Sequence, residues 1–271
     1  MKNFAVIGNP IKHSLSPILH RWVYKALNLD AKYIKIKISA NSLSDFIKNI
    51  NKNNLDGINI TLPFKISSME YVDVINPRAK IIGSINHIDI NNRKIIGNNT
   101  DWYGFILALK NNKIDIVGKE VTVLGYGGVS RAVIFALKHL GAKKINLFNR
   151  SYDKIAFLND NLIYSHKLSQ LEKIINNDSI IINCTSCGML TNESLIKPNF
   201  INEKQTIIDT IYIPTKTKLV LDAEKMGAKT INGLDMFIYQ ALISIDLWFG
   251  EPISSKVNFI DLKTYLESKI C

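Results

Sequence analysis

The chain has little of several things that would define a protein class at once. Its three cysteines, Cys184, Cys187 and Cys271, are too few for a disulfide framework in 271 residues, and their odd number fits a reducing cytosol. Cys184 and Cys187 form a C-x-x-C, but no second pair and no histidine at ligand spacing accompanies it, so we expect no metal site. Seven prolines and 14 glycines exclude collagen-like and low-complexity chains.

Long apolar runs are absent as well. The first run, Phe4 to Ile7, ends at Gly8 and is too short for the core of a signal peptide. Nothing approaches the roughly 18 uninterrupted apolar residues of a membrane-spanning helix. A hydrophobic fraction of 46% with 21% charged residues indicates a folded chain, and we expect a cytoplasmic protein without a membrane partner.

Arginine is scarce although the chain is basic. Lys and Arg number 34 against 23 Asp and Glu, a net charge of +11, which raises the question of a nucleic-acid partner. Only five of the 34 are arginine, the side chain that reads phosphate and guanine best, and no helix-turn-helix, zinc or RNP-type motif is present. We therefore interpret the charge as a solvated lysine coat and expect no nucleic-acid partner.

Short β-branched runs alternate with helical patterns along the chain, which is typical of an α/β protein with largely parallel strands. The length fits one to two domains. We expect strands over residues 4–7, 32–38, 57–61, 81–86, 88–90, 94–96, 120–124, 144–148, 179–183 and 206–211. We expect helices over 17–28 with Ser16 as N-cap, 42–51, 102–110, a stretch ending at His139, 233–250 and 257–269.

A glycine turn follows the strand expected at 120–124 and opens a helix. It consists of Gly125, Tyr126, Gly127, Gly128 and Val129. Small residues here let the backbone turn sharply and approach a pyrophosphate, whose charge the helix N-terminus then balances. Ser130 stands where a G-x-G-x-x-G motif has its third glycine, but the strand, turn, helix and strand within about thirty residues still predict a dinucleotide site.

The end of the next strand discriminates between cofactors. An NAD site usually has an acidic residue about 20 residues beyond the glycines, where it binds the ribose 2′-hydroxyl. This strand ends instead in Asn149, Arg150 and Ser151, with no acid before Asp153. The Arg150 guanidinium is suited to a 2′-phosphate, and Lys154 adds a second positive charge. The sequence therefore predicts NADP rather than NAD.

Three polar segments stand out in residues 1–101. Ser14 and Ser16 lie in the loop after the first strand, Lys65 follows the strand expected at 57–61, and Asp101 follows the last strand of this part. Hydroxyls, an ammonium and a carboxylate at strand ends fit a polyol carboxylate substrate beside a proton donor.

With these segments the sequence resembles the shikimate dehydrogenase family over nearly its whole length. The matching stretches are residues 8–17, 59–65, 99–101 with 104–105, the turn at 125, 149–151, 183–189, Asp209 with Tyr212, Pro214 and Thr217, and 232–233 with Gln240 and Ala241. The resemblance implies NADPH-dependent reduction of 3-dehydroshikimate to shikimate, a step of aromatic amino-acid synthesis. It also implies two α/β domains, an N-terminal substrate domain and a Rossmann-type NADP-binding domain, with the active site in the cleft between them.

The resemblance assigns roles to particular residues. Lys65 and Asp101 would act at the reacting oxygen, and Ser14 and Ser16 would bind the substrate carboxylate. Thr61, Asn86 and Gln240 would surround the substrate hydroxyls together with that pair, while Tyr212 would approach the ring from the cofactor side. The residues expected to bind NADP are Gly125, Tyr126, Gly127, Gly128, Val129, Asn149, Arg150, Ser151, Lys154, Thr185 and Gly233.

We expect the substrate domain to span residues 1–101, the NADP-binding domain 102–236, and the C-terminal helices of 237–271 to return to the first domain. The protein would be a monomer or homodimer with a small-molecule substrate. Trp102, Arg21 and His87 depart from the family pattern, and Trp102 bears on substrate preference. Two alternatives stay open: a quinate/shikimate dehydrogenase of broader specificity, and a non-catalytic regulator that binds shikimate-like compounds.

Overall fold

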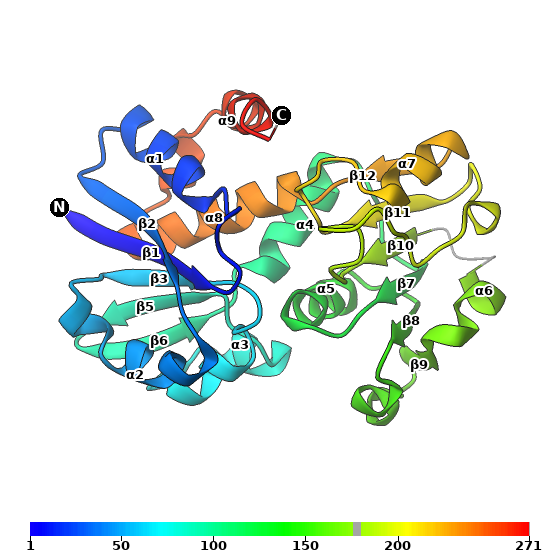
Figure 1. The fold of residues 1–271 in the computed structure, drawn as a ribbon, viewed down its shortest axis with the longest axis horizontal. Helices are drawn as coiled ribbons and strands as arrows, with labels where there is room; N and C mark the ends of the chain where they lie inside the picture. The colour runs from blue at the N-terminus through cyan, green and yellow to red at the C-terminus, as the bar shows by residue number, and fades with distance from the viewer. Residues whose placement is uncertain (176–179, 271) are drawn as a thin grey trace. The chain divides into compact units, whose positions relative to one another are not determined.

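The computed structural model describes residues 1–175 and 180–270, which form two compact units. The first unit contains residues 1–104 and 238–269, and the second contains residues 105–237 with Ile270. Each unit is built on one six-stranded sheet (Figure 1). No helix in the described part of the chain is long and apolar enough to cross a membrane.

The sheet of the first unit is mixed rather than largely parallel. Its strands are β1 (Lys2–Gly8), β2 (Ala31–Lys37), β3 (Gly57–Ile60), β4 (Val74–Ile75), β5 (His87–Asn91) and β6 (Lys94–Asn98), in the order β2-β1-β3-β5-β6-β4. Strands β2, β1 and β3 run parallel, whereas β5 is antiparallel to both β3 and β6. The hairpin of β5 and β6 turns through Asn92 and Arg93, both with positive φ.

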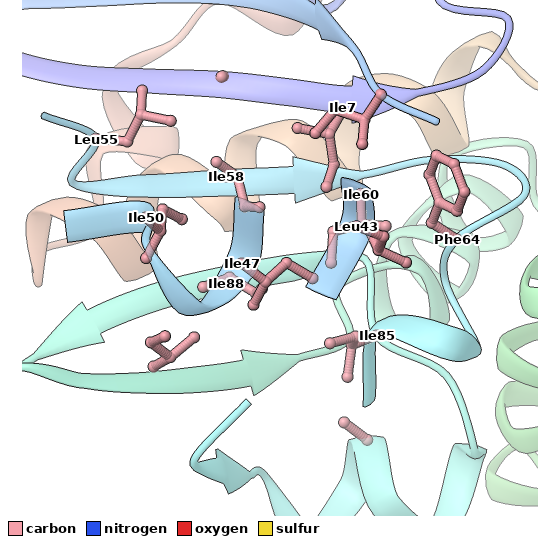
Figure 2. Packing of buried hydrophobic residues seen from close by; sticks show 14 residues of the cluster. Ile7, Leu43, Ile47, Ile50, Leu55, Ile58, Ile60, Phe64, Ile85 and Ile88 are labelled. Carbon is pink, nitrogen blue, oxygen red and sulfur yellow. The ribbon is translucent and has the colours of Figure 1, made fainter. Parts of the chain in front are cut away.

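Helices cover both faces of this sheet. On one face, α2 (Leu43–Lys48) and α3 (Pro77–Ile82) close a core rich in isoleucine, part of which Figure 2 shows. The other face packs against α1 (Ser16–Ala26) and α8 (Leu234–Phe249), with α9 (Phe259–Glu267) against α1. On that face the Trp248 ring of α8 stacks on Phe4 and on His87, with ring centroids 4.2 and 4.9 Å apart. Alternation along the strands thus gives each face its own core.

The sheet of the second unit is entirely parallel. Its strands are β7 (Glu120–Leu124), β8 (Lys144–Asn149), β9 (Ile163–Lys167), β10 (Ile180–Asn183), β11 (Thr206–Asp209) and β12 (Lys229–Ile231). The helices of this unit are α4 (Asp101–Asn111), which begins in the first unit, α5 (Gly128–His139), α6 (Leu171–Ile174) and α7 (Lys218–Lys225). The strand order β12-β11-β10-β7-β8-β9 is that of a Rossmann sheet, with the order reversing beside β7.

Two expectations about local structure were wrong. Residues 81–86 are not a strand, because α3 occupies Pro77–Ile82: Asn76 caps its N-terminus by accepting from the Arg78 backbone N–H, and Gly83 ends it with φ +72°. Ser16 is the first residue of α1 and not its cap, and the Ser14 hydroxyl accepts from the Ser16 backbone N–H at 3.3 Å. The expected strand at 179–183 is β10, and its first residue, Ser179, lies outside the described residues.

Candidate active site

Lys65 and Asp101 form a buried ion pair in the first unit. The Lys65 Nζ lies 2.7 Å from Asp101 Oδ2, and the two side chains are 12% and 4% exposed. Lys65 stands in the loop after β3, and Asp101 is the first residue of α4. A carboxylate and an ammonium this deeply buried each need the other, because a single buried charge without its partner is costly.

The Asp101 carboxylate is positioned by the turn that precedes it. The Asn99 side chain accepts from the backbone N–H groups of Asp101 at 3.0 Å and of Trp102 at 3.4 Å. Its own amide donates to the carbonyl and the hydroxyl of Ser84. Asn99 therefore caps α4 and fixes where the Asp101 side chain leaves the backbone.

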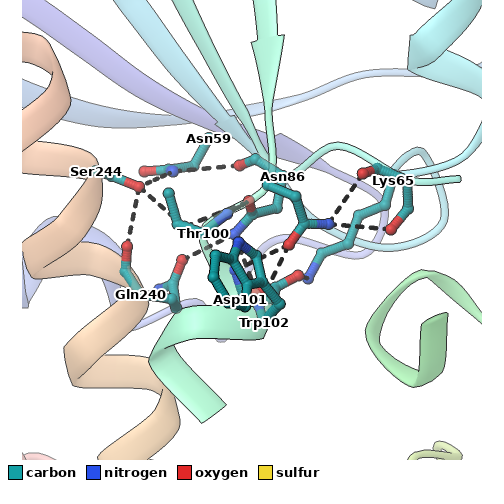
Figure 3. Close-up of polar contacts among 10 residues, drawn as sticks. Asn59, Lys65, Asn86, Thr100, Asp101, Trp102, Gln240 and Ser244 are labelled. Atoms are coloured by element: carbon teal, nitrogen blue, oxygen red, sulfur yellow. Dashed lines mark hydrogen bonds and ion pairs between the residues drawn. The ribbon is translucent and has the colours of Figure 1, made fainter. Parts of the chain in front are cut away.

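The Asn86 side chain is the centre of the polar cluster that surrounds this pair (Figure 3). Its Nδ2 lies 2.9 Å from Asp101 Oδ1, 2.9 Å from Thr100 Oγ1 and 3.2 Å from Gln240 Oε1. Its Oδ1 accepts from the Thr100 backbone N–H at 2.6 Å. The structure thus brings together four of the residues expected at the substrate, Lys65, Asp101, Asn86 and Gln240.

Ser14, Ser16 and Thr61 are placed by neighbouring loops of the same unit. The Ser14 hydroxyl donates to Ser16 Oγ at 3.2 Å, so the two expected carboxylate ligands lie together at the start of α1. The Thr61 backbone N–H donates to the Ile7 carbonyl, which holds the loop after β3 against the end of β1. A Cβ at Gly8 would meet the Thr61 methyl group at 2.5 Å, so glycine is required for this close approach.

In the second unit the glycine turn joins β7 to α5. Gly125 has φ +93°, and a Cβ there would lie 2.8 Å from the Thr185 methyl group. Gly127 is the N-cap of α5, and the space around its missing Cβ is open within 4 Å. No side chain among the described residues caps α5, and its first turn holds no acid. A helix N-terminus without a side-chain cap or an acid suits a phosphate, as a dinucleotide would require.

The residues after β8 lie where the sheet order predicts the adenosine end of a dinucleotide. The Asn149 amide donates to the Ser151 carbonyl at 2.9 Å, which shapes the turn that exposes Arg150. Lys154 ends a short 3-10 helix (Tyr152–Lys154) and is also exposed. In the described part of the chain Arg150 and Lys154 form no ion pair, so both charges are available to an anion. These features fit an NADP 2′-phosphate.

The loop after β10 is fixed by a buried carboxylate. Asp209 accepts from the Thr217 hydroxyl at 2.7 Å, from Asn183 Nδ2 at 3.1 Å and from a backbone N–H. Burial raises the pKa of Asp209 to about 6, although these hydrogen bonds oppose the shift. Asn183 in turn accepts from the hydroxyl and the backbone N–H of Thr185, so Asp209 sets the position of Thr185.

Two further expected residues belong to the second unit. The Tyr212 ring stacks on Phe237 with centroids 4.4 Å apart, and burial raises the pKa of Tyr212 to about 12. Gly233 lies directly against the Thr210 carbonyl, where no side chain fits. The pair Cys184 and Cys187 is not disulfide-bonded, and no group of three metal ligands occurs among the described residues.

Sequence reasoning did not identify Ser244 or the roles of Asn59 and Thr100. Ser244 is fully buried on α8, and its hydroxyl contacts Asn59 Nδ2 at 2.9 Å and Thr100 Oγ1 at 3.3 Å. A signal was available, because Ser244 is one helical turn from Gln240 in a largely apolar helix.

One unit contains a Rossmann sheet, and the other contains a buried lysine–aspartate pair. This combination is typical of dinucleotide-dependent oxidoreductases. Two family models match: the shikimate dehydrogenase substrate binding domain over residues 6–88, and shikimate / quinate 5-dehydrogenase over residues 107–233. The chain belongs to the shikimate dehydrogenase family.

Individual relatives match over nearly their full length. A shikimate dehydrogenase (NADP(+)) of Bacillus mycoides is 38% identical over 256 residues, which cover 91% of this chain and 92% of the relative. One of Staphylococcus haemolyticus is 35% identical and covers 98% of each chain. A solved shikimate 5-dehydrogenase of Thermus thermophilus, in complex with NADP(H) and shikimate, has a TM-score of 0.83 at 30% identity, covering 92% of this chain and 94% of its own.

Proposed function

We propose that this protein is an NADP-dependent shikimate dehydrogenase, which reversibly reduces 3-dehydroshikimate to shikimate in aromatic amino-acid synthesis. The observation that carries the proposal is the buried Lys65–Asp101 pair with Asn86 and Gln240 around it, in a chain of this family. It supplies a proton donor and hydroxyl-binding groups at one place. A regulator that only binds its ligand has no need of the proton donor.

Lys65 and Asp101 are the proposed catalytic residues. Reduction turns the substrate carbonyl oxygen into an alkoxide, which must be protonated as it forms. The Lys65 ammonium donates that proton and takes it back in the reverse direction. Asp101 accepts a hydrogen bond from Lys65 at 2.7 Å and directs the remaining ammonium hydrogens toward the substrate. Asn86 fixes the other carboxylate oxygen of Asp101 at 2.9 Å, so Asp101 cannot rotate away.

The remaining substrate contacts follow from chemistry. Ser14 and Ser16 donate hydroxyl hydrogens to the substrate carboxylate, while Thr61, Asn86 and Gln240 bind the ring hydroxyls. Tyr212 of the second unit is the further proposed substrate residue. A polyol substrate needs several neutral donors and acceptors, because each unmatched hydroxyl weakens binding.

The cofactor is NADP. NADPH, when bound, supplies the hydride that reduces the carbonyl carbon. The glycine turn and the N-terminus of α5 hold the pyrophosphate, Arg150 and Lys154 hold the 2′-phosphate, and Thr185 and Gly233 shape the site through close backbone approach. The other proposed contacts are Tyr126, Val129, Asn149 and Ser151.

The division of labour follows the two units. We assign substrate binding to residues 1–101, NADP binding to 102–236, and support of the substrate domain to the C-terminal helices. The proposed working form is a monomer or homodimer in the cytoplasm, with small molecules as its ligands.

Initial rates of purified protein test the function. Shikimate and quinate are each offered with NADP and with NAD, and the absorbance of reduced nicotinamide is followed. We expect shikimate with NADP to be the preferred pairing by at least about tenfold in kcat/KM, given the contribution of one charged contact. Faster turnover of quinate with NAD would instead identify the quinate/shikimate enzyme, and binding of shikimate without turnover would identify a regulator.

A further inference from the structure

The Asn86 side-chain amide has more hydrogen-bond acceptors around it than hydrogens to donate. Its Nδ2 carries two hydrogens, while Thr100 Oγ1, Asp101 Oδ1 and Gln240 Oε1 all lie within 3.2 Å of it. How these hydrogens are divided depends on what else each acceptor is bonded to. The partner of Thr100 is therefore decisive, because Thr100 competes directly with the two groups proposed to act on the substrate side.

That partner is the hydroxyl of Ser244. Ser244 Oγ lies 3.3 Å from Thr100 Oγ1, donates to the Gln240 carbonyl at 3.0 Å and accepts from Asn59 Nδ2 at 2.9 Å. It is completely buried, so water does not replace any of these contacts without rearrangement. One hydroxyl thus joins α8, β3 and the turn before α4 (Figure 3).

Asn59 holds the Ser244 hydroxyl in place from the sheet. Its Oδ1 accepts from the Tyr33 phenol at 2.8 Å, and its Nδ2 donates to Ser244 and, at 3.2 Å, to the Asn86 carbonyl. The Tyr33 ring is stacked on His20 with centroids 3.7 Å apart. Both amide hydrogens of Asn59 are therefore committed, and the orientation of this side chain is fixed from three sides.

We propose that Ser244 is a positioning residue, whose hydroxyl holds Thr100 so that the Asn86 amide serves Asp101 and Gln240. Because the one hydroxyl hydrogen of Ser244 goes to the Gln240 carbonyl, the Thr100 hydroxyl is the donor to Ser244. Without Ser244, the Thr100 hydroxyl turns its hydrogen to Asn86 Oδ1, which lies 3.3 Å away, and pulls the Asn86 side chain toward itself. The contact with Gln240, at 3.2 Å the longest of the three, is the first to be lost. The inference rests on the proposed function, because its kinetic effect appears through substrate binding by Asn86 and Gln240.

Two variants of Ser244 separate hydrogen bonding from packing. Ser244→Ala removes the hydroxyl, and Ser244→Cys fills the volume with a weak donor and acceptor. We expect both to raise KM for shikimate about tenfold, the value of roughly one net hydrogen bond, and to leave KM for NADP unchanged. A wild-type KM for shikimate in Ser244→Cys would contradict the proposal, because packing alone would then explain the residue.

Ser68→Ala is the matched control. Ser68 is also completely buried in the first unit, and its hydroxyl has no hydrogen-bond partner among the described residues. We expect its rates to be those of the wild type. In a double-mutant cycle, Ser244→Ala should add less than about twofold to the KM of Gln240→Ala, whereas full additivity would show that Ser244 does not act through Gln240.

A readout without turnover keeps the inference separate from the proposed function. Solvent exchange of the Asn86 side-chain amide hydrogens is followed by NMR in the wild type, Ser244→Ala and Ser68→Ala. We expect exchange at least about tenfold faster in Ser244→Ala alone. Unchanged exchange would overturn the role of Ser244 whether or not the protein oxidises shikimate. A wild type that lacks turnover, but shows this difference, would overturn only the function.

Discussion

Side chains build the candidate site of the first unit, whereas backbone conformation builds that of the second. Lys65, Asp101 and Asn86 are buried and already hydrogen-bonded to one another. The glycine turn instead leads into α5, whose N-terminus no side chain of the described residues caps, and the exposed Arg150 follows the next strand, β8. The first arrangement suits the proposed proton transfer, and the second suits the proposed binding of an extended anion.

Burial also shifts the pKa of ionisable groups of opposite kind in the two units. The first unit buries His20 and His87, and burial lowers the pKa of both, that of His87 to about 3. The second buries Asp209, whose pKa burial raises to about 6. In each case the neutral form is favoured, but the consequences for stability against pH have opposite sign.

Loss of the proposed proton donor in the first unit should have the largest effect. We expect Lys65→Ala to lower kcat about 10³-fold with little change in shikimate affinity, because the alkoxide then lacks its acid. Steady-state rates and calorimetric binding of shikimate measure the two quantities. Lys80→Ala, at an exposed lysine of the same unit, is the control. Near-normal kcat in Lys65→Ala would remove the proposed role.

Asp101→Asn should be the next most severe change. The amide keeps the shape but loses the charge that orients Lys65, so we expect kcat to fall about 10²-fold. The measurement is kcat across the pH range with saturating shikimate and NADP. An unimpaired Asp101→Asn would mean that the ion pair is structural, and the comparison between the units would lose its catalytic meaning.

Arg150→Gln tests the second unit in the same way. Removing the exposed guanidinium should raise KM for NADP about tenfold or more and leave KM for NAD within about twofold, because only NADP has the 2′-phosphate. Arg93→Gln, at an exposed turn of the first unit, serves as the control. An equal loss with both cofactors would place Arg150 outside the 2′-phosphate site.

The smallest expected effect is on stability in acid. An unfolded histidine titrates near 6.5 and folded His87 near 3, so its contribution is complete above pH 6.5 and is lost as the pH falls toward 3. Between pH 7 and pH 5 the loss in the free energy of unfolding from His87 amounts to about 2 kcal/mol. Urea unfolding of His87→Leu should therefore lose less stability between pH 7 and pH 5 than the wild type.

Two variants complete that experiment. His13→Leu, at an exposed histidine, should retain the wild-type dependence on pH. The Asp209 carboxyl has the opposite effect to His87, because it binds its proton more tightly in the folded than in the unfolded state. Protonation of Asp209 therefore stabilises the folded state as the pH falls through 6 toward 3.8, and Asp209→Asn should remove this stabilisation. Identical slopes for wild type and His87→Leu would contradict the burial of a neutral His87.

Local patterns were sufficient to predict the part of the second unit around the glycine turn, whereas β9, β12, α6 and α7 were not predicted. The glycine turn, β7 and α5 occur where the sequence predicted them, because a parallel buried strand, positive-φ glycines and a helix N-terminus are contiguous in the chain. In the first unit, Asn76, Pro77 and Gly83 are the signals of α3, but the apolar run that begins at Ile81 favoured a strand.

The polar cluster was only partly predictable. Lys65 and Asp101 carry charges at strand ends and so stand out, whereas Ser244 and Asn59 are neutral, and their partners lie 144, 185 and 26 to 27 residues away in sequence. Only the packing of α8 on the sheet brings them together. Short strands such as β4 and β12 were not predicted, because two or three residues are too few to show the alternation of apolar and polar side chains that marks a strand.

Conversion of 3-dehydroshikimate with NADPH tests the central claim most directly. The reaction is followed by proton NMR in the wild type and in Lys65→Ala, with the consumption of NADPH measured in the same sample. The wild type should form shikimate in a one-to-one ratio with the NADPH consumed, while Lys65→Ala forms almost none in the same time. NADPH consumption without shikimate, or no reaction in the wild type, would contradict the proposed function.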